Sequence, residues 1–393
     1  MKMKSIRTKV VVACLCCLAV GLSGILALLN YSFNRNAQNL AAQAVTGAQS
    51  LFAISEAREI RKMAALTQSL NLNPQIGDAL LARDRYRLVE MTAPFFLNLK
   101  EDGITDFSFH TQELDPAVLL RLEDPARYGD HMDRYMDKQV ATTMLMVTGN
   151  DMGKGGFAVR TISPMFGSKG EVAGYVEFGE ELGQFLKAMK SQTGDDYALL
   201  LDKKYVNREF WTASNETLNR RDNWNDAPNY VVWDKTSKSD RICNFKGDLG
   251  TVPVSGMALD RFHEGNAEFV RGVFPVQDAA GNKVGAIFVV HDISSYYGSM
   301  RRNETIFAVS TAVAVLIGTG IFLFMLSRLI FQRLERIIQI ATRVVGGDHG
   351  TEIKVSSDDE VGQLEQLFEQ FRQVFVFVLS QVTELTPKDL EPK

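Results

Sequence analysis

The chain has 393 residues, and its formal net charge of −4 reflects 43 basic against 47 acidic side chains. This near-neutral charge gives no sign of a nucleic-acid partner. The five histidines include no pair at metal-ligand spacing, and the sequence has no phosphate-binding loop, Gly-x-Ser-x-Gly elbow or Cys/His nucleophile pair. We therefore expect a protein that is not an enzyme and has no catalytic residue, no metal site and no cofactor.

Two apolar stretches without a charged residue flank the polar middle of the chain. The first covers residues 10–29, behind a basic tail of residues 1–9, and the second covers residues 306–327. At about 1.5 Å per residue, each can cross a hydrocarbon core of roughly 30 Å as a helix. A cleaved signal peptide is the alternative for the first stretch, but no small-residue cleavage site follows it directly. We predict two transmembrane helices.

Basic residues set the expected orientation of these two helices. They stand before the first span and after the second, as Lys2, Lys4, Arg7, Lys9, Arg328, Arg333, Arg336 and Arg343. The positive-inside rule predicts a two-pass protein of the inner cell membrane, with both termini cytoplasmic and residues 30–300 outside the cytoplasm. Cys243 is the one cysteine in this outer region, so no internal disulfide can hold it together.

A long helix is predicted to follow the first span. Small and apolar residues recur at steps of three and four from Ala37 to Phe52, which is the spacing of one helix face. No proline or other strong breaker interrupts the pattern before Asn71-Leu72-Asn73-Pro74. We expect a helical stalk that continues the span and packs along the outer region.

Two segments of the outer region repeat one another. Five residues recur at an offset of 111: Val159, Arg160, Pro164, Gly170 and Gly174 return as Val270, Arg271, Pro275, Gly281 and Gly285. Each copy is typical of strand, turn and strand, with the glycine in the turn and the proline ending the first strand. The predicted strands are 157–164 with 172–178, and 268–276 with 284–291. Duplication of an α+β module explains the pattern, and chance similarity of two hairpins is the alternative.

The outer region resembles the double Cache sensor domain of bacterial chemoreceptors and sensor histidine kinases, in which two PAS-like modules follow a long helix. Residues 120–130 read LRLEDPARYGD, which is similar to a Leu-Arg-x-x-x-Pro-x-x-Tyr-Gly-Asp signature of one subfamily. Many relatives have His two residues after this Arg, where the chain has Glu123, so their ligand chemistry does not transfer. The resemblance implies a distal module over about 50–185 and a proximal module over about 190–298.

The proximal module is expected to begin with a strand at Tyr197 to Asp202. The polar residues 215–226 are expected to form a loop over its sheet. Trp211, Trp224 and Trp233 lie in or beside this loop, where they are either structural or part of a ligand cage. We favour the structural interpretation.

The distal module carries the candidate ligand site, because it has the family-like signature. A PAS-like module binds small molecules between its sheet and the segments that cross it, in a pocket with apolar walls and a few fixed polar groups. The candidate ligand-binding residues are Phe107, Phe109, His110, Arg121, Tyr128, Asp130, Arg160 and Glu177. A buried Arg would favour a carboxylate through paired charge-assisted hydrogen bonds. Alternatively, Arg121 and Asp130 only fix the loop, and Arg160 faces solvent.

Residues 328–385 resemble a HAMP domain, with a helix, a Gly346-Gly347 break, a connector and a second helix that opens Asp-Glu-Val-Gly-Gln-Leu at residue 359. The proline usual near the start of such domains is missing. The second helix has a heptad seam of Val361, Leu364, Phe368, Phe371, Phe375, Val378, Val382 and Leu385. This seam predicts a helical coiled coil in a parallel homodimer. A helix lying on the membrane is the alternative, but its polar face is not basic.

Only a short tail, residues 386–393, follows the seam. A signalling hairpin, kinase or cyclase needs a full domain, so we expect input and transmission in this sequence without an output domain. The expected function is a transmembrane signal-transduction receptor for a small extracytoplasmic ligand. Its output would then lie on a separate cytoplasmic signalling partner. A truncated chemoreceptor or sensor kinase is one alternative, and a membrane-tethered ligand-binding protein without signalling is another.

Overall fold

The computed structural model describes residues 6–153, 156–217, 220–239, 245–348 and 350–384. Cys243, Leu385 of the predicted seam, the 386–393 tail and residues 1–5 of the basic tail lie outside these ranges. The chain divides into two compact units: Ser32–Ser299, and the helices that precede and follow it.

In its described residues, the sensor unit contains ten strands and most of the helices. In chain order the elements are α1 (Ile6–Asn71, which begins in the other unit), α2 (Pro74–Leu81), α3 (Arg85–Glu101), β1 (Asp106–His110), β2 (Val118–Arg121), α4 (Tyr135–Thr143), β3 (Val147–Gly153), β4 (Gly156–Phe166), β5 (Val172–Glu181), α5 (Leu182–Thr193), β6 (Asp196–Asp202), α6 (Arg208–Thr217), β7 (Tyr230–Lys235), β8 (Met257–Glu264), β9 (Ala267–Gln277) and β10 (Lys283–Asp292). Short 3₁₀ turns lie at Lys203–Tyr205 and Leu249–Thr251.

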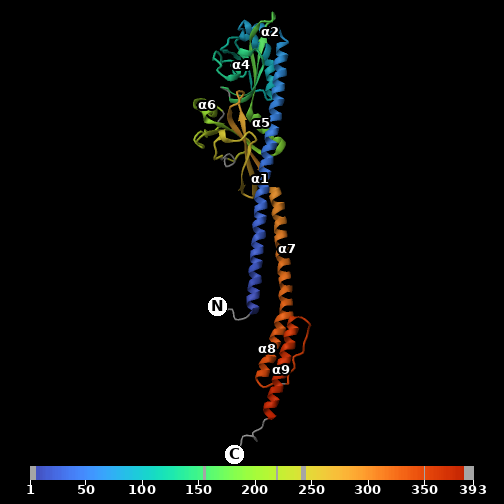
Figure 1. The fold of residues 1–393 in the computed structure, drawn as a ribbon. Coiled ribbons are helices and arrows are strands. Elements are labelled where there is room, and N and C mark those ends of the chain that lie inside the picture. Colours follow the sequence, from blue (N-terminus) through green and yellow to red (C-terminus); the bar gives the residue numbers. More distant parts are fainter. Residues whose placement is uncertain (1–5, 154–155, 218–219, 240–244, 349, 385–393) are drawn as a thin grey trace, which may run out of the picture. The chain divides into compact units, whose positions relative to one another are not determined.

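The predicted long helix is confirmed as α1, which appears as the blue helix running past both sheets in Figure 1. It ends at Asn71, where the sequence placed its breaker. Asn73 caps the next helix by accepting a hydrogen bond from the Gln75 amide, and Pro74 occupies the first position of α2. Proline suits that position because the first amides of a helix have no intrahelical acceptor.

The duplication predicted from the 111-residue repeat is confirmed in the sheets. The distal sheet (β1–β5) has the strand order β2-β1-β5-β4-β3, and the proximal sheet (β6–β10) has the same order, β7-β6-β10-β9-β8. Both are antiparallel, and each predicted hairpin forms with strands slightly longer than expected. Gly170 and Gly281 hold φ angles of +80° and +85° in their turns, which only glycine adopts readily.

Two sequence predictions about local structure were wrong. Pro164 does not end its strand: it pairs with Tyr175, and β4 continues to Phe166. The proline is tolerated because β3 pairs with β4 only up to Ile162, which leaves one side of β4 unpartnered at residue 164. The expected 215–226 loop also begins inside a helix, because α6 extends to Thr217.

One apolar core spans both sheets and is completed by α1. Val45, Ala48, Phe52, Met63 and Leu70 of this helix are buried against the sheets, and α5 contributes further apolar residues. A close approach at Gly272 of β9 brings Val45 onto the proximal sheet. The stalk helix is therefore part of the sensor fold rather than a spacer beside it.

The second unit contains the long helices that follow the sensor. It consists of α7 (Ser294–Leu326, which begins in the sensor unit), a π-helical turn (Ser327–Phe331), α8 (Gln332–Val345) and α9 (Glu360–Glu384). The described chain has two helices that are long and apolar enough to cross a membrane, and these contain the predicted spans. The predicted break after α8 is confirmed at Gly346 and Gly347.

Replacing Gly272 with alanine should destabilise the sensor unit by about 1–3 kcal/mol through overpacking. The added Cβ would collide with the Val45 side chain and lie 3.1 Å from the Met257 carbonyl oxygen. All three tryptophans lie in this unit, so fluorescence-monitored urea unfolding of the full chain reports its stability. Gly298→Ala is the control, since it meets no atom within 4 Å and should be neutral or stabilising. Equal stability of the two variants would contradict the close approach.

Candidate functional site

Charged side chains that are almost fully buried occupy one face of the distal sheet. Ser108 of β1 lies opposite Glu177 of β5 in the strand register. Side chains two residues apart on a strand share a face, so Asp106 and His110 lie on this face with Ser108. Arg160 of β4 joins them, because its Nη1 donates to Asp106 and to Glu177 at 2.6 Å each.

Glu177 is the centre of this network, and only 2% of it is exposed. Its carboxylate accepts hydrogen bonds from Arg134, at 3.0 and 2.6 Å, as well as from Arg160. Burial alone would raise the pKa of Glu177, but the Arg134 and Arg160 guanidinium groups hold it well below its usual range. The carboxylate therefore stays ionised inside the protein.

His110 connects Glu177 to α4. Its Nε2 lies 3.2 Å from Glu177, and its Nδ1 lies 3.3 Å from Asp137 of α4. Burial would lower the pKa of His110, yet the hydrogen bonds to Asp137 and Glu177 raise it above its usual value. Arg134, just before α4, also bonds Asp137 at 2.7 and 3.2 Å, so Arg134 and His110 together tie α4 to the sheet.

The same three residues, His110, Asp137 and Glu177, place their ligand atoms within 4.8 Å of one another. Their contacts do not suit a metal ion, because the two carboxylates lie at opposite nitrogens of the imidazole. An ion would also have to displace Arg134, which already bonds both carboxylates. We interpret this group as an ion-pair network.

Arg121 fixes the segment that crosses the polar face. It is 5% exposed, and it forms two parallel hydrogen bonds with Asp130 at 2.7 and 2.8 Å. It also donates to the Arg127 carbonyl oxygen at 3.0 Å. Tyr128 of the same segment is 56% exposed, with the Arg85 guanidinium 3.5 Å from its ring centre.

A small cavity of about 30 Å³ lies within this network. It has room for only one or two water molecules, so a larger ligand requires the crossing segment to move. The lining residues are Asp106, Ser108, Val118, Arg121, Glu123, Arg127, Met132, Arg134, Gly153, Arg160 and Glu177.

The structure places the predicted site residues in several environments. Arg121, Arg160 and Glu177 line the cavity, and His110 and Asp130 contact residues that do. Phe107 and Phe109 lie on the opposite face of β1, fully buried in the apolar core. Tyr128 lies at the exposed outer side of the crossing segment.

Sequence reasoning missed Arg134, Asp137 and Asp151 as members of this network. Asp151 of β3 lies 3.7 Å from the Arg134 Nε. The spacing of Arg134 and Asp137 suggests only a local helix pair, and no sequence pattern connects them to Glu177. The repeat did contain a signal, however. The residue 111 positions after Glu177 is Phe288, so the two modules differ in polarity at this position.

The equivalent face of the proximal sheet is filled with apolar side chains. Phe288 packs there with Phe245, Tyr230, Ala198 and Leu200. In the strand registers, Ala198 lies opposite Phe288 as Ser108 lies opposite Glu177. Arg271, the repeat partner of Arg160, pairs instead with Asp260, which is 55% exposed. Among the described residues, this position of the proximal module therefore holds an apolar cluster in place of the polar network.

Comparison with known families gives two matches. Residues 42–248, more than half of the chain, match the family described as a double sensory domain of two-component sensor kinases. Residues 325–374 match the HAMP domain. These matches confirm the two resemblances predicted from the sequence.

A similar sequence is the sensor protein SrrB of Staphylococcus aureus (strain NCTC 8325 / PS 47), 36% identical over 94 residues. That match covers 24% of this chain and only 16% of SrrB. Among solved structures, the periplasmic domain of Vibrio cholerae LuxQ is 14% identical with a TM-score of 0.37, over 65% of this chain and 99% of that one.

Two further solved structures have the same degree of likeness. The ligand-binding domain of the Campylobacter jejuni chemoreceptor Tlp3 in complex with L-valine is 10% identical with a TM-score of 0.36, over 68% of this chain and 95% of that one. The sensor domain of the V. cholerae histidine kinase DctB is 11% identical with a TM-score of 0.35, over 68% and 98%.

Replacing Glu177 with glutamine should destabilise the sensor unit by about 3–5 kcal/mol, because Arg134, Arg160 and His110 would lose a shared buried counter-charge. Urea unfolding followed by tryptophan fluorescence measures the change. The control is Glu113→Gln, which breaks an exposed pair with Arg83 and should cost about 1 kcal/mol or less. A loss in Glu177→Gln no larger than in the control would contradict the network.

Stability should fall as the pH rises from 5 to 8. Burial raises the pKa of Glu123 and of Glu180 to about 7 and that of Asp151 to about 6. The folded chain holds these protons more tightly than the unfolded chain. Their stabilising effect is therefore complete below the unfolded pKa values near 4 and is lost as the pH rises through 6 and 7. His110, whose pKa is also raised, acts in the same direction.

Thermal unfolding of the full chain at pH 5, 6, 7 and 8 tests this dependence. Glu180→Gln should reduce the decline, while Glu101→Gln at the exposed end of α3 should leave it unchanged. Stability that does not fall over this range would contradict the raised pKa values of these carboxyl groups.

Proposed function

The chain belongs to the family of double sensory domains of two-component sensor kinases, and from this premise we propose that it is a transmembrane receptor. Its distal module binds a small ligand outside the cytoplasm, and α7, α8 and α9 transmit the resulting change inward. Its role is reception rather than catalysis.

The observation that carries this proposal is the contrast between the two duplicated modules. The distal module buries a charged network and a cavity where the proximal module buries an apolar cluster. Buried charges do not strengthen a fold more than well-packed apolar residues of similar volume would. A polar interior confined to one of two copies is typical of a binding site.

The membrane topology follows from the two apolar helices. The N-terminal part of α1 and the apolar part of α7 cross the inner membrane. By the positive-inside rule, the basic residues beside them favour an orientation with both termini in the cytoplasm and Ser32–Ser299 outside it. Ligand recognition and the HAMP helices then lie on opposite sides of the membrane.

Two contacts connect the distal sheet to the stalk helix. Lys62 of α1 pairs with Glu59 of the same helix and lies 3.5 Å from Glu180 at the end of β5. Asn150 of β3 donates to Glu56 of α1 at 2.5 Å and accepts from the Ala279 amide of the proximal hairpin at 2.8 Å. A shift of the distal sheet would therefore reach both α1 and the proximal module.

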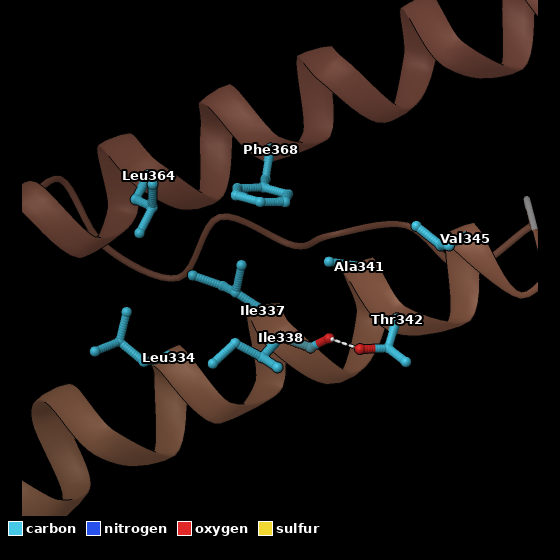
Figure 2. Close-up of a pocket in the computed structure, with 8 residues that line it drawn as sticks. All are labelled: Leu334, Ile337, Ile338, Ala341, Thr342, Val345, Leu364 and Phe368. Atoms are coloured by element: carbon cyan, nitrogen blue, oxygen red, sulfur yellow. Dashed lines mark hydrogen bonds between the residues drawn. The ribbon is translucent and has the colours of Figure 1, made fainter. Parts of the chain in front are cut away.

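The partner that completes the HAMP helices is a second copy of the chain. Figure 2 shows an apolar groove between α8 and α9, lined by Leu334, Ile337, Ile338, Ala341, Thr342, Val345, Leu364 and Phe368. Ile338 is 64% exposed, and Phe371 of the predicted seam is also 64% exposed. A parallel dimer would bury both surfaces together, as the heptad spacing requires.

The ligand enters by displacing the segment that Arg121 holds over the polar face. The arginines that suggested a carboxylate ligand each bond a carboxylate of the chain, so such a ligand would have to replace Asp130, Asp106 or Glu177. A ligand transmits a signal only if it binds the open and closed arrangements with different affinity.

Replacing Arg121 with alanine should change ligand affinity at least about tenfold, or about 1.4 kcal/mol, because Arg121 lines the cavity and holds the segment that the ligand displaces. The measurement is a thermal-shift screen of small molecules on the full chain in detergent, followed by titration of each hit. Arg83→Ala, at an exposed pair with Glu113, is the control. If every hit keeps its affinity in Arg121→Ala, the ligand does not bind in the distal cavity.

Replacing Phe371 with glutamate should convert a dimer into a monomer, because it places a charge in the centre of the proposed seam. Light scattering coupled to chromatography of the detergent-solubilised chain gives the mass. Gln370→Glu adds a charge at the adjacent exposed position and should leave the dimer intact. A wild-type monomer would refute the dimer, as would a dimer that survives Phe371→Glu.

A further inference from the structure

A second and larger pocket, the junction pocket, lies where the two modules meet the stalk helix. Its volume is about 300 Å³, against about 30 Å³ for the distal cavity. Pockets that hold small molecules begin at roughly 300 Å³. Three parts of the sensor unit line it, together with Val254: one face of α1, β3 of the distal sheet, and residues 274–279 of the proximal hairpin. None of these residues lines the distal cavity.

Contacts between the modules hold the walls of the junction pocket in place. The Ala279 amide of the proximal turn donates to the Asn150 carbonyl oxygen at 2.8 Å. A Cβ on Gly149 would lie 2.9 Å from the Ala279 Cβ, so β3 and this turn approach as closely as glycine allows. On α1, the Gln49 side chain donates to the Val254 carbonyl oxygen at 2.7 Å. The junction pocket is therefore accessible without the displacement that the distal cavity requires.

Glu56 of α1 is a charged group of the junction pocket without a cation beside it. Among the described residues it forms no ion pair, and its side-chain partner is Asn150, whose Nδ2 donates at 2.5 Å. Burial raises the pKa of Glu56, because the carboxylate has lost water without gaining a counter-charge. The other acid of the lining, Asp278, accepts hydrogen bonds from the Ala280 and Asn282 amides at 3.0 and 2.8 Å. The described residues that line the pocket include no Lys, Arg or His.

Asn150 has an unsatisfied acceptor beside Glu56. The residue is 6% exposed, and its Nδ2 also donates to the Gln277 carbonyl oxygen at 3.3 Å. Because both neighbours of Nδ2 are acceptors, the orientation of the amide is defined, and its Oδ1 has no partner among the described residues. Leaving a buried acceptor unpaired costs free energy. An occupant with N–H groups beside Glu56 would bond the carboxylate and, once the amide turns, the Oδ1 as well.

Apolar side chains form much of the remaining wall. Phe52, Phe274 and Val276 are almost fully buried, and the ring centres of the two phenylalanines lie 6.0 Å apart. An organic cation suits this combination, because its N–H donors and its charge match the carboxylate while its carbon part matches the apolar wall. A calcium ion suits it less well, since calcium takes about six to eight oxygen ligands and this wall offers carbon.

We propose that the junction pocket is a second ligand site, which takes a small organic cation with its N–H groups on Glu56 and its apolar part against Phe52 and Phe274. This goes beyond the receptor function proposed above, because the site neither uses the distal cavity nor depends on it. An occupant contacts α1, β3 and the proximal turn together. It would therefore act on the stalk helix directly.

Three probes that share one ring, benzylammonium, benzyl alcohol and benzoate, test the charge class. Each is titrated by calorimetry into the full chain in an uncharged detergent at pH 8. Benzylammonium should bind at least about tenfold more tightly than the other two, because only its hydrogen bonds to the carboxylate are charge-assisted.

Glu56→Gln removes the charge but keeps an acceptor for Asn150, so the fold should be retained while benzylammonium affinity falls at least about tenfold. Glu101→Gln, at the exposed end of α3, is the matched control and should bind like wild type. Ala53→Leu fills the pocket from an exposed position of α1 and should weaken benzylammonium binding without changing the charge. Partition of the probe into detergent is the same for every variant and cancels in the comparison.

The assignment fails if benzyl alcohol or benzoate binds as tightly as benzylammonium, or if none of the three binds. It fails equally if Glu56→Gln or Ala53→Leu keeps the wild-type affinity, because the probe then binds elsewhere. If calcium chloride alone gives a heat that Glu56→Gln abolishes, the pocket is a metal site instead. The Arg121→Ala titration reports on the distal cavity, so either proposal can fail while the other stands.

Discussion

The buried carboxylate of Glu177 is the interaction on which the distal module depends. An ionised group that is 2% exposed needs counter-charges, and the fold supplies them from three directions. Arg160 reaches it from the neighbouring strand, His110 from β1, and Arg134 from the start of α4. Through these contacts one acid fixes both the helix over the polar face and the charges that a ligand would meet.

The two modules share a duplicated fold but differ at the position of this buried acid. Both sheets have the same strand order and the same hairpin, and α1 packs against both through one apolar core. The copies differ at the position of Glu177, where the proximal module has Phe288. The proximal face is packed with apolar side chains, whereas the distal face keeps a polar interior.

The distal cavity also shows why the charge of a ligand cannot be inferred from single side chains of the site. The arginines of the distal module were reasons to expect an anionic ligand while their partners were unknown. Once Arg121 and Arg160 are each seen bonded to a carboxylate of the chain, they no longer indicate an anionic ligand. The charge that a ligand meets in a site therefore depends on which charged side chains already have a partner within the protein.

Local sequence patterns were enough to predict the long helix, its end at Asn71, the two hairpins and the break after α8. Each of these follows from local periodicity or from a residue whose backbone preference is strong. The pairing of Arg121 with Asp130 was also accessible, as one of two alternatives. The face on which Phe107 and Phe109 lie, and the network that joins Arg134 and Asp137 to Glu177, became clear only in the folded chain. These depend on strand register and on which element covers which face, where residues far apart in the chain come within hydrogen-bond distance.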